Sequence, residues 1–288
     1  MPPNDDQLKR LEQFLGRALQ PDARPALRKP RRGPGRPIAA PPTPAGARRI
    51  TLEEAVPGGY AVRVAERGSL YKVITPVGKE LLTPERFSAA FAGAETPFQQ
   101  RLWQSCRMTA TLEDLLFVDL ETTGLAQAPL FLIGAMSWEQ DGLLIRQFLA
   151  RNADEEAAVI QAFVDLAAAK ALLITFNGKS FDLPTLYQRA TANGLLCVLH
   201  ARHFDLLHEC RQAWRAGLPN CQLQTLEEHI CGHPPREQDI PGEHIPAAYQ
   251  AFLRNGNALQ LAQIMRHNVR DLLTMAELLG RLPSLSDG

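Results

Sequence analysis

The stretch LLFVDLETTGL, residues 115–125, decides how the rest of this 288-residue chain is interpreted. Its first half is an apolar run typical of a buried strand, and we expect a strand over residues 117–121. Two acids, Asp119 and Glu121, interrupt the end of that run. Side chains alternate along a strand, so both carboxylates point to one face, about 7 Å apart. A polar strand end facing water has the same pattern, so the meaning of the pair depends on other acids.

The first additional acid is Asp182, at the end of FNGKSFD, residues 176–182. A buried strand is expected over residues 171–176 and a helix over residues 183–193, so Asp182 falls at the junction between them. A carboxylate is favourable at a helix N-cap, which by itself would account for Asp182.

The second additional acid is Asp271, in HNVRD near the C-terminus, where a long helix is expected over residues 258–281. His267 precedes Asp271 by four positions, which puts both side chains on one helical face. A His–Asp pair on a solvated helix would explain this motif alone.

Taken together, the three motifs are more specific than any one of them. D-x-E at a strand end, N-x-x-x-F-D at a strand–helix junction and H-x-x-x-D in a late helix resemble the DEDD superfamily of 3′–5′ exonucleases. The last two spacings look most like the exonuclease domains of family B DNA polymerases, which carry Tyr where this chain has His267. The superfamily's usual His lies five residues before the Asp, so the identity of the general base stays open.

Longer segments narrow the resemblance. ETTGL, FLIGAMSW, FNGKSFDLPTLYQR, HFDLLHECRQAW and HNVRDLLTMAEL are similar to the bacterial YprB-type ribonuclease H-like domain family, over about residues 112–281. The resemblance implies an α/β, RNase H-like three-layer fold with a mixed central sheet flanked by helices, plus a small strand-rich N-terminal extension.

The resemblance also implies a metal site. Four carboxylates supply the hard oxygen ligands that Mg²⁺ or Mn²⁺ prefers, and two such ions would hold a scissile phosphate. His267 would orient or deprotonate the attacking water, a task for which imidazole is suited. The predicted ligands are Asp119, Glu121, Asp182 and Asp271, with Asp119 between both ions.

A nucleic acid is the implied partner, and single-stranded 3′ ends are favoured because an end must thread into the site. The residues expected to contact the terminal nucleotide are Thr122, Thr123, Gly124, Leu125 and Asn177. The leading prediction is a metal-dependent nuclease, a 3′–5′ exonuclease on single-stranded DNA or RNA. Two alternatives stay open: a catalytically inactive nucleic-acid-binding adaptor and a structure-specific endonuclease.

The rest of the chain suggests three parts. Residues 1–49 combine an amphipathic helix over 5–19, which a protein partner could contact, with a disordered basic Pro-rich linker. Residues 21–49 carry eight Arg or Lys and one Asp, so the remaining residues sum to −7 in this neutral chain. Residues 50–110 form the strand and helix extension, and residues 111–283 form the RNase H-like domain.

Several other elements follow from periodicity. Strands are expected over 130–137, 143–149 and 197–199, and helices over 84–107, 152–170, 206–216, 223–231 and 247–254. No apolar run reaches 18 residues, the first residues lack a signal-peptide core, and the five cysteines form no C-x-x-C pair. We therefore expect a cytoplasmic protein without a membrane span.

Overall fold

The computed structural model describes residues 49–77, 96–124, 128–139, 142–236 and 239–284. The chain divides into two compact units. One is built from Met1–Gly58 and Arg236–His267, and the other from Gly59–Pro235 and Asn268–Gly288. The predicted helix over residues 5–19, the basic linker before Arg49 and the first part of the helix expected over 84–107 lie outside the described residues.

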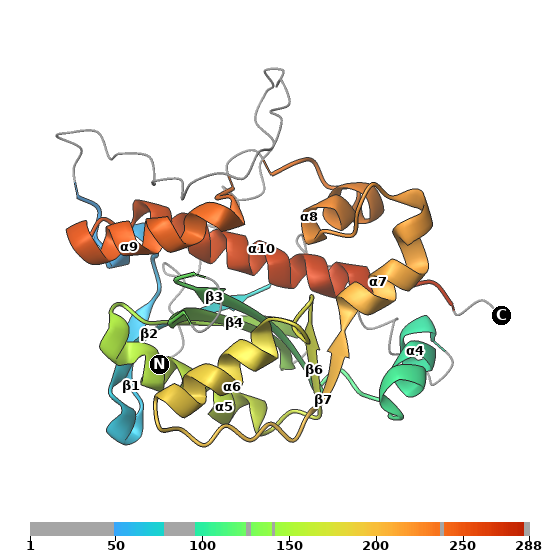
Figure 1. Cartoon of the computed structure of the whole chain (residues 1–288), viewed down its shortest axis with the longest axis horizontal. Helices are drawn as coiled ribbons and strands as arrows, with labels where there is room; N and C mark the ends of the chain where they lie inside the picture. The colour runs from blue at the N-terminus through green and yellow to red at the C-terminus, as the bar shows by residue number, and fades with distance from the viewer. Residues whose placement is uncertain (1–48, 78–95, 125–127, 140–141, 237–238, 285–288) are drawn as a thin grey trace. The chain divides into compact units, whose positions relative to one another are not determined.

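A seven-stranded mixed sheet forms the centre of the larger unit, in the order β1-β2-β5-β4-β3-β6-β7 (Figure 1). Its strands are β1 (Tyr60–Arg63), β2 (Ser69–Pro76), β3 (Leu115–Thr122), β4 (Leu130–Glu139), β5 (Gly142–Leu149), β6 (Leu172–Thr175) and β7 (Arg202–Asp205). The predicted N-terminal strands therefore extend the main sheet, because β2 pairs antiparallel with β5.

The interior strand β3 joins the antiparallel part of the sheet to its parallel part. It runs antiparallel to β4 and parallel to β6, and its pairing with β6 ends at Phe117 and Ile174. Since β6 stops at Thr175, the end of β3 that carries the two acids continues past its neighbour. This leaves an edge position beside Leu120 for another group to fill.

Helices cover both faces of this sheet, as the RNase H-like prediction requires. Figure 1 shows α5 (Glu156–Ala167) and α6 (Asp182–Ala192) on one face and, on the other, the part of α10 (Leu259–Arg281) that begins at Asn268. The larger unit also contains α4 (Pro97–Cys106), α7 (Leu206–Trp214) and α8 (Leu223–Leu226), which continues as a π-helix over Glu227–Cys231. The smaller unit contains α2 (Leu52–Ala55) and α9 (Ile245–Asn255).

One buried acid fastens three of these elements together. Glu156, at the start of α5, is 4% exposed, and its Oε1 accepts the backbone N–H of Leu130 on β4 at 2.7 Å. Its other oxygen pairs with Arg189 of α6 at 2.6 Å. These partners satisfy both oxygens of the buried carboxylate and connect α5, β4 and α6.

One strand prediction is wrong. Residues 197–199 adopt no regular structure, and β7, which begins three residues later at Arg202, pairs with β6 instead. The apolar side chains Leu196 and Val198 are 84% and 46% exposed. Their alternate spacing resembles that of a half-buried strand, but the two side chains are not buried against a sheet. In the described part of the chain, no helix combines the length and apolarity that crossing a membrane requires.

Candidate active site

The first acid pair lies on β3, in the middle of the sheet. Asp119 is opposite Gly134 of β4 and Glu121 is opposite Leu132, and both acids are partly buried. The register shifts between Glu121 and Thr122, so the strand is irregular directly after the acids. Two carboxylates on the face of β3 that α10 covers introduce negative charge into an otherwise apolar strand.

Asp182 fills the edge position beside β3. Its Oδ1 accepts the backbone N–H of Leu120 at 3.2 Å, so the carboxylate lies next to the strand residue that follows Asp119. The predicted N-cap role is wrong, because Asp182 is already inside α6 and Phe181 is the N-cap. Burial raises the pKa of Asp182 to about 7; the Leu120 N–H opposes the rise and the charge of Asp205 adds to it.

The loop that leads to Asp182 is held by Asp205. Its Oδ1 accepts the N–H of Asn177 at 2.8 Å and its Oδ2 accepts the N–H of Lys179 at 3.0 Å. Asn177 has a φ of 67°, a left-handed conformation that Asn tolerates better than most residues. The conformational role of Asn177 is therefore visible, whereas its predicted contact with a nucleotide stays a prediction.

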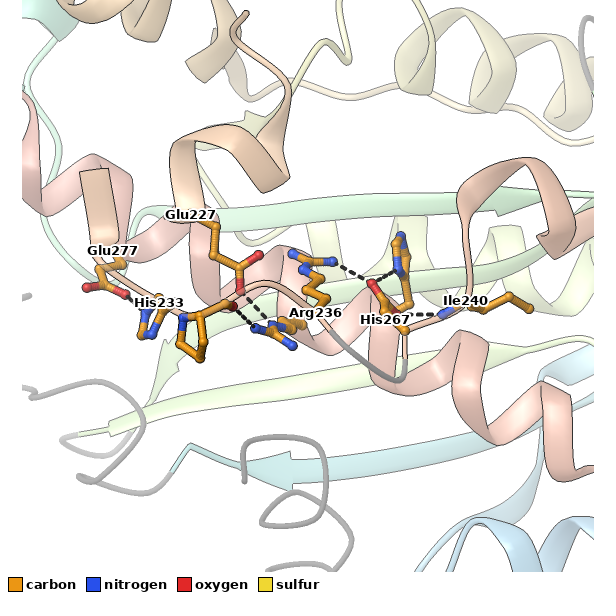
Figure 2. A network of polar contacts seen from close by, with 9 residues as sticks. Glu227, His233, Arg236, Ile240, His267 and Glu277 are labelled. Atoms are coloured by element: carbon orange, nitrogen blue, oxygen red, sulfur yellow. Dashed lines mark hydrogen bonds and ion pairs between the residues drawn. The ribbon is translucent and has the colours of Figure 1, made fainter. Parts of the chain in front are cut away.

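The last predicted acid, Asp271, lies on α10, the helix that contacts β3 through Asn268. Asn268, one helical turn earlier on the same face, donates from Nδ2 to Oδ2 of Asp119 at 2.7 Å. The neighbouring Arg270 pairs through Nε with the buried Glu227 at 2.6 Å, which holds the helix on the opposite side (Figure 2). These contacts fasten α10 and α6 to adjacent residues of β3, and the convergence of Asp271 with the other acids stays a prediction.

His267 belongs to the smaller unit, where it contacts a residue that sequence reasoning missed. Its Nδ1 donates to Oδ2 of Asp239 at 2.7 Å, and Arg236 pairs with the same oxygen at 3.1 Å (Figure 2). Burial opposes ionisation of Asp239, yet the hydrogen bond and charge of His267, with Arg236, hold its pKa below the ordinary value. Because a carboxylate can only accept, this contact places a hydrogen on Nδ1 of His267.

The residues expected to contact a nucleotide are partly engaged in the turn after β3. The Thr122 hydroxyl donates to the Gly124 carbonyl at 2.6 Å, and the Thr123 N–H donates to the Pro129 carbonyl at 2.9 Å. These contacts shape the loop, and the predicted nucleotide contacts stay predictions. Leu125 lies outside the described residues.

The chemistry of the predicted metal ligands suits a hard divalent cation. Four carboxylates are the donor set that Mg²⁺ and Mn²⁺ take, and a cation would stabilise the ionised form of the buried Asp182. Across the described ranges, however, no three His, Cys, Asp or Glu side chains are grouped so that they could hold a metal ion. The ligand set therefore stays a prediction that the donor chemistry fits.

The fold and these motifs define a class of protein. A family model of the RNase_H superfamily matches residues 116–282, which contain all four carboxylates. The chain belongs to this superfamily, and the matched residues have an RNase H-like fold, a fold of nuclease type.

A named relative agrees with the more specific resemblance. The chain is 32% identical over 192 residues to "Uncharacterized protein YprB" of Bacillus subtilis (strain 168), covering 62% of this chain and 45% of the relative. The YprB-type RNase H-like family is thus confirmed, although the chain spans less than half the relative's length. The family B DNA polymerase of Pyrobaculum calidifontis matches with a TM-score of 0.47 and 20% identity, over 58% of this chain and 23% of the polymerase. That similarity is too low to carry an argument.

Proposed function

We propose that this protein is a metal-dependent nuclease that removes nucleotides from the 3′ ends of single-stranded DNA or RNA. The observation that carries the proposal is the pair of hydrogen bonds around β3. Asp182 accepts from Leu120 and Asn268 donates to Asp119, so two distant segments contact successive residues of one strand. An RNase H-like domain with acids on all three segments supports phosphodiester hydrolysis.

Each acid has a proposed role. Asp119, Glu121, Asp182 and Asp271 would hold the divalent ions. When bound, a pair of Mg²⁺ or Mn²⁺ ions supplies positive charge to the attacking and leaving oxygens of the scissile phosphate. The chain's own task is to orient these carboxylates, and the hydrogen bonds to Asp119 and Asp182 assist in this.

His267 is the proposed proton acceptor. Asp239 holds the hydrogen on Nδ1, so Nε2 can accept a proton from water. Its position on α10, four residues before Asp271, supports this role in the same way that the sequence spacing does.

The test uses the purified full chain, Mn²⁺ and single-stranded DNA and RNA labelled at either end. We expect stepwise loss from the 3′ end and at least a hundredfold loss of rate in Asp119→Asn. Asp165→Asn, which removes an exposed acid from α5, is the matched control and should retain full rate. Equal rates for wild type and Asp119→Asn would refute the proposal.

Two further outcomes assign the alternatives. Binding of a labelled strand without cleavage under Mg²⁺ or Mn²⁺ would indicate the adaptor. Cleavage of a circular single strand, which has no 3′ end, would indicate an endonuclease.

A further inference from the structure

A row of three residues crosses the sheet beneath α10. Asp119 of β3 is opposite Gly134 of β4, and Gly134 is opposite Gln147 of β5. Asn268 of α10 is fully buried over the middle of this row. A Cβ on Gly134 would lie 2.1 Å from Asn268 Oδ1, so the glycine leaves the space that the amide occupies.

The Asn268 amide is hydrogen-bonded on both sides. Nδ2 donates to Oδ2 of Asp119 at 2.7 Å and to its backbone carbonyl at 3.2 Å, while Oδ1 accepts from Gln147 Nε2 at 2.8 Å. Rotating the amide by 180° would place its oxygen against the Asp119 carboxylate and its NH₂ against the Gln147 NH₂. Because a carboxylate can only accept, Asp119 determines that the NH₂ of Asn268 faces it, and the Gln147 donor helps to hold the amide in that orientation.

We propose that Asn268, oriented by Gln147, is a positioning residue for the Asp119 carboxylate. The hydrogen bond to Oδ2 restricts rotation about the Cβ–Cγ bond of Asp119, which sets the direction of Oδ1 before any ligand binds. The amide is neutral, so Asn268 adds no positive charge that would compete with a cation for the carboxylate. This inference rests on the proposed function, because it assumes that Asp119 is a metal ligand.

A purely structural role for Asn268 makes a different prediction. If the amide only fastens α10 to the sheet, its loss lowers stability without changing metal affinity in the molecules that stay folded. If it positions Asp119, Mn²⁺ affinity falls about 10- to 100-fold, the range seen when residues that orient metal ligands are removed.

The test compares three variants by Mn²⁺ titration, followed through the EPR signal of free Mn²⁺, with thermal unfolding measured alongside. Asn268→Leu keeps the side-chain shape but removes the amide, and Gln147→Met removes only the donor that orients it. Thr274→Val, a loss of another buried polar group on α10, is the matched control. We expect a large loss of affinity for Asn268→Leu, a smaller one for Gln147→Met and none for Thr274→Val.

The outcomes separate this inference from the nuclease proposal. Unchanged Mn²⁺ affinity in Asn268→Leu and Gln147→Met would overturn the positioning role, even if the wild type cleaves nucleic acid. If Asn268→Leu does not fold, Gln147→Met decides the question, because it keeps the side-chain shape and removes only the donor that holds the Asn268 amide against Asp119. Mn²⁺ binding that weakens as expected, in a protein that cleaves nothing, would support the inference and refute the exonuclease. A wild type that binds no Mn²⁺ would overturn both.

Discussion

The backbone N–H of Leu120 donates to Oδ1 of Asp182 across 3.2 Å, at a position where the sheet has no further strand. Pairing between β3 and β6 ends at Phe117, so the carboxylate occupies the place that another β6 residue would have taken. The Asp182 side chain thus supplies the hydrogen-bond acceptor that a longer β6 would have supplied to β3. The same contact holds its carboxylate next to Asp119.

Replacing Asp182 with Asn should abolish activity yet stabilise the metal-free protein at neutral and higher pH. The amide oxygen can still accept from Leu120, while the cost of burying a charge disappears. Burial raises the pKa of Asp182 from 3.8 to about 7, so folding favours the protonated form. The stability that this group contributes is complete below pH 3.8 and is lost as the pH rises to about 7.

The measurement is the difference in unfolding midpoint between Asp182→Asn and wild type, in a chelator, at pH 5 and pH 8. The unfolding midpoint of the variant, relative to that of the wild type, should be several degrees higher at pH 8 than at pH 5. A difference that is independent of pH would contradict the assigned environment of Asp182.

Substituting Glu156 with Gln should destabilise the fold strongly. The buried carboxylate accepts from Leu130 and pairs with Arg189, and breaking such a pair leaves Arg189 without its partner charge. We expect a loss of roughly 2–4 kcal/mol in unfolding free energy, measured by urea denaturation. Asp165→Asn, on the same helix but exposed, should cost about 0.5 kcal/mol or less. Equal costs for the two variants would be inconsistent with the network.

A methyl group on Gly134 should displace α10. The new Cβ would overlap the Asn268 amide, and overpacking of this kind costs about 1–3 kcal/mol. Gly142→Ala on the adjoining strand is the control, because a Cβ there meets nothing within 4 Å. Chemical denaturation of both variants checks the prediction, which would be wrong if Gly134→Ala were as stable as Gly142→Ala.

The Asp239→Asn variant should be less stable than the wild type at neutral pH, with a gap that closes in acid. Although burial disfavours its charge, Asp239 is paired with His267 and Arg236, and its pKa is lowered. A lowered pKa contributes stability that is present above the ordinary value near 4 and is lost as the pH falls further. Unfolding midpoints at pH 7, 5 and 3 test this, and a gap that widens in acid would contradict it.

The motif around Asp119 was the most informative part of the sequence, because it predicted both a strand of the fold and part of the candidate site. The apolar run before Asp119 predicted a buried strand, and the family resemblance predicted the mixed sheet and the helical layers. The predicted strand over 197–199 failed because local alternation says nothing about whether a sheet edge is available. The N-cap assignment of Asp182 failed for a related reason, since its partner Leu120 comes from a strand 62 residues away.

The contacts that orient the acids could not be predicted from spacing. Asn268 and Gln147 lie 121 residues apart, and nothing in either segment alone identifies the other. A signal was nevertheless present in Gly134, because a glycine inside an apolar strand marks a close approach by another group. Asp239 had only its place in a Pro- and Gly-rich loop to suggest a partner for His267.

The space left above Gly134 helps to determine where α10 packs on the sheet. The apolar side chains that follow, Leu272, Met275 and Leu279, would pack acceptably if the helix slid by one turn or rolled slightly. A single amide that fits only above a glycine removes that freedom, because each residue of shift turns the helix by about 100° and carries the amide off its partners. The hydrogen bonds of Asn268 therefore allow α10 only one position along the sheet and one rotation about its own axis.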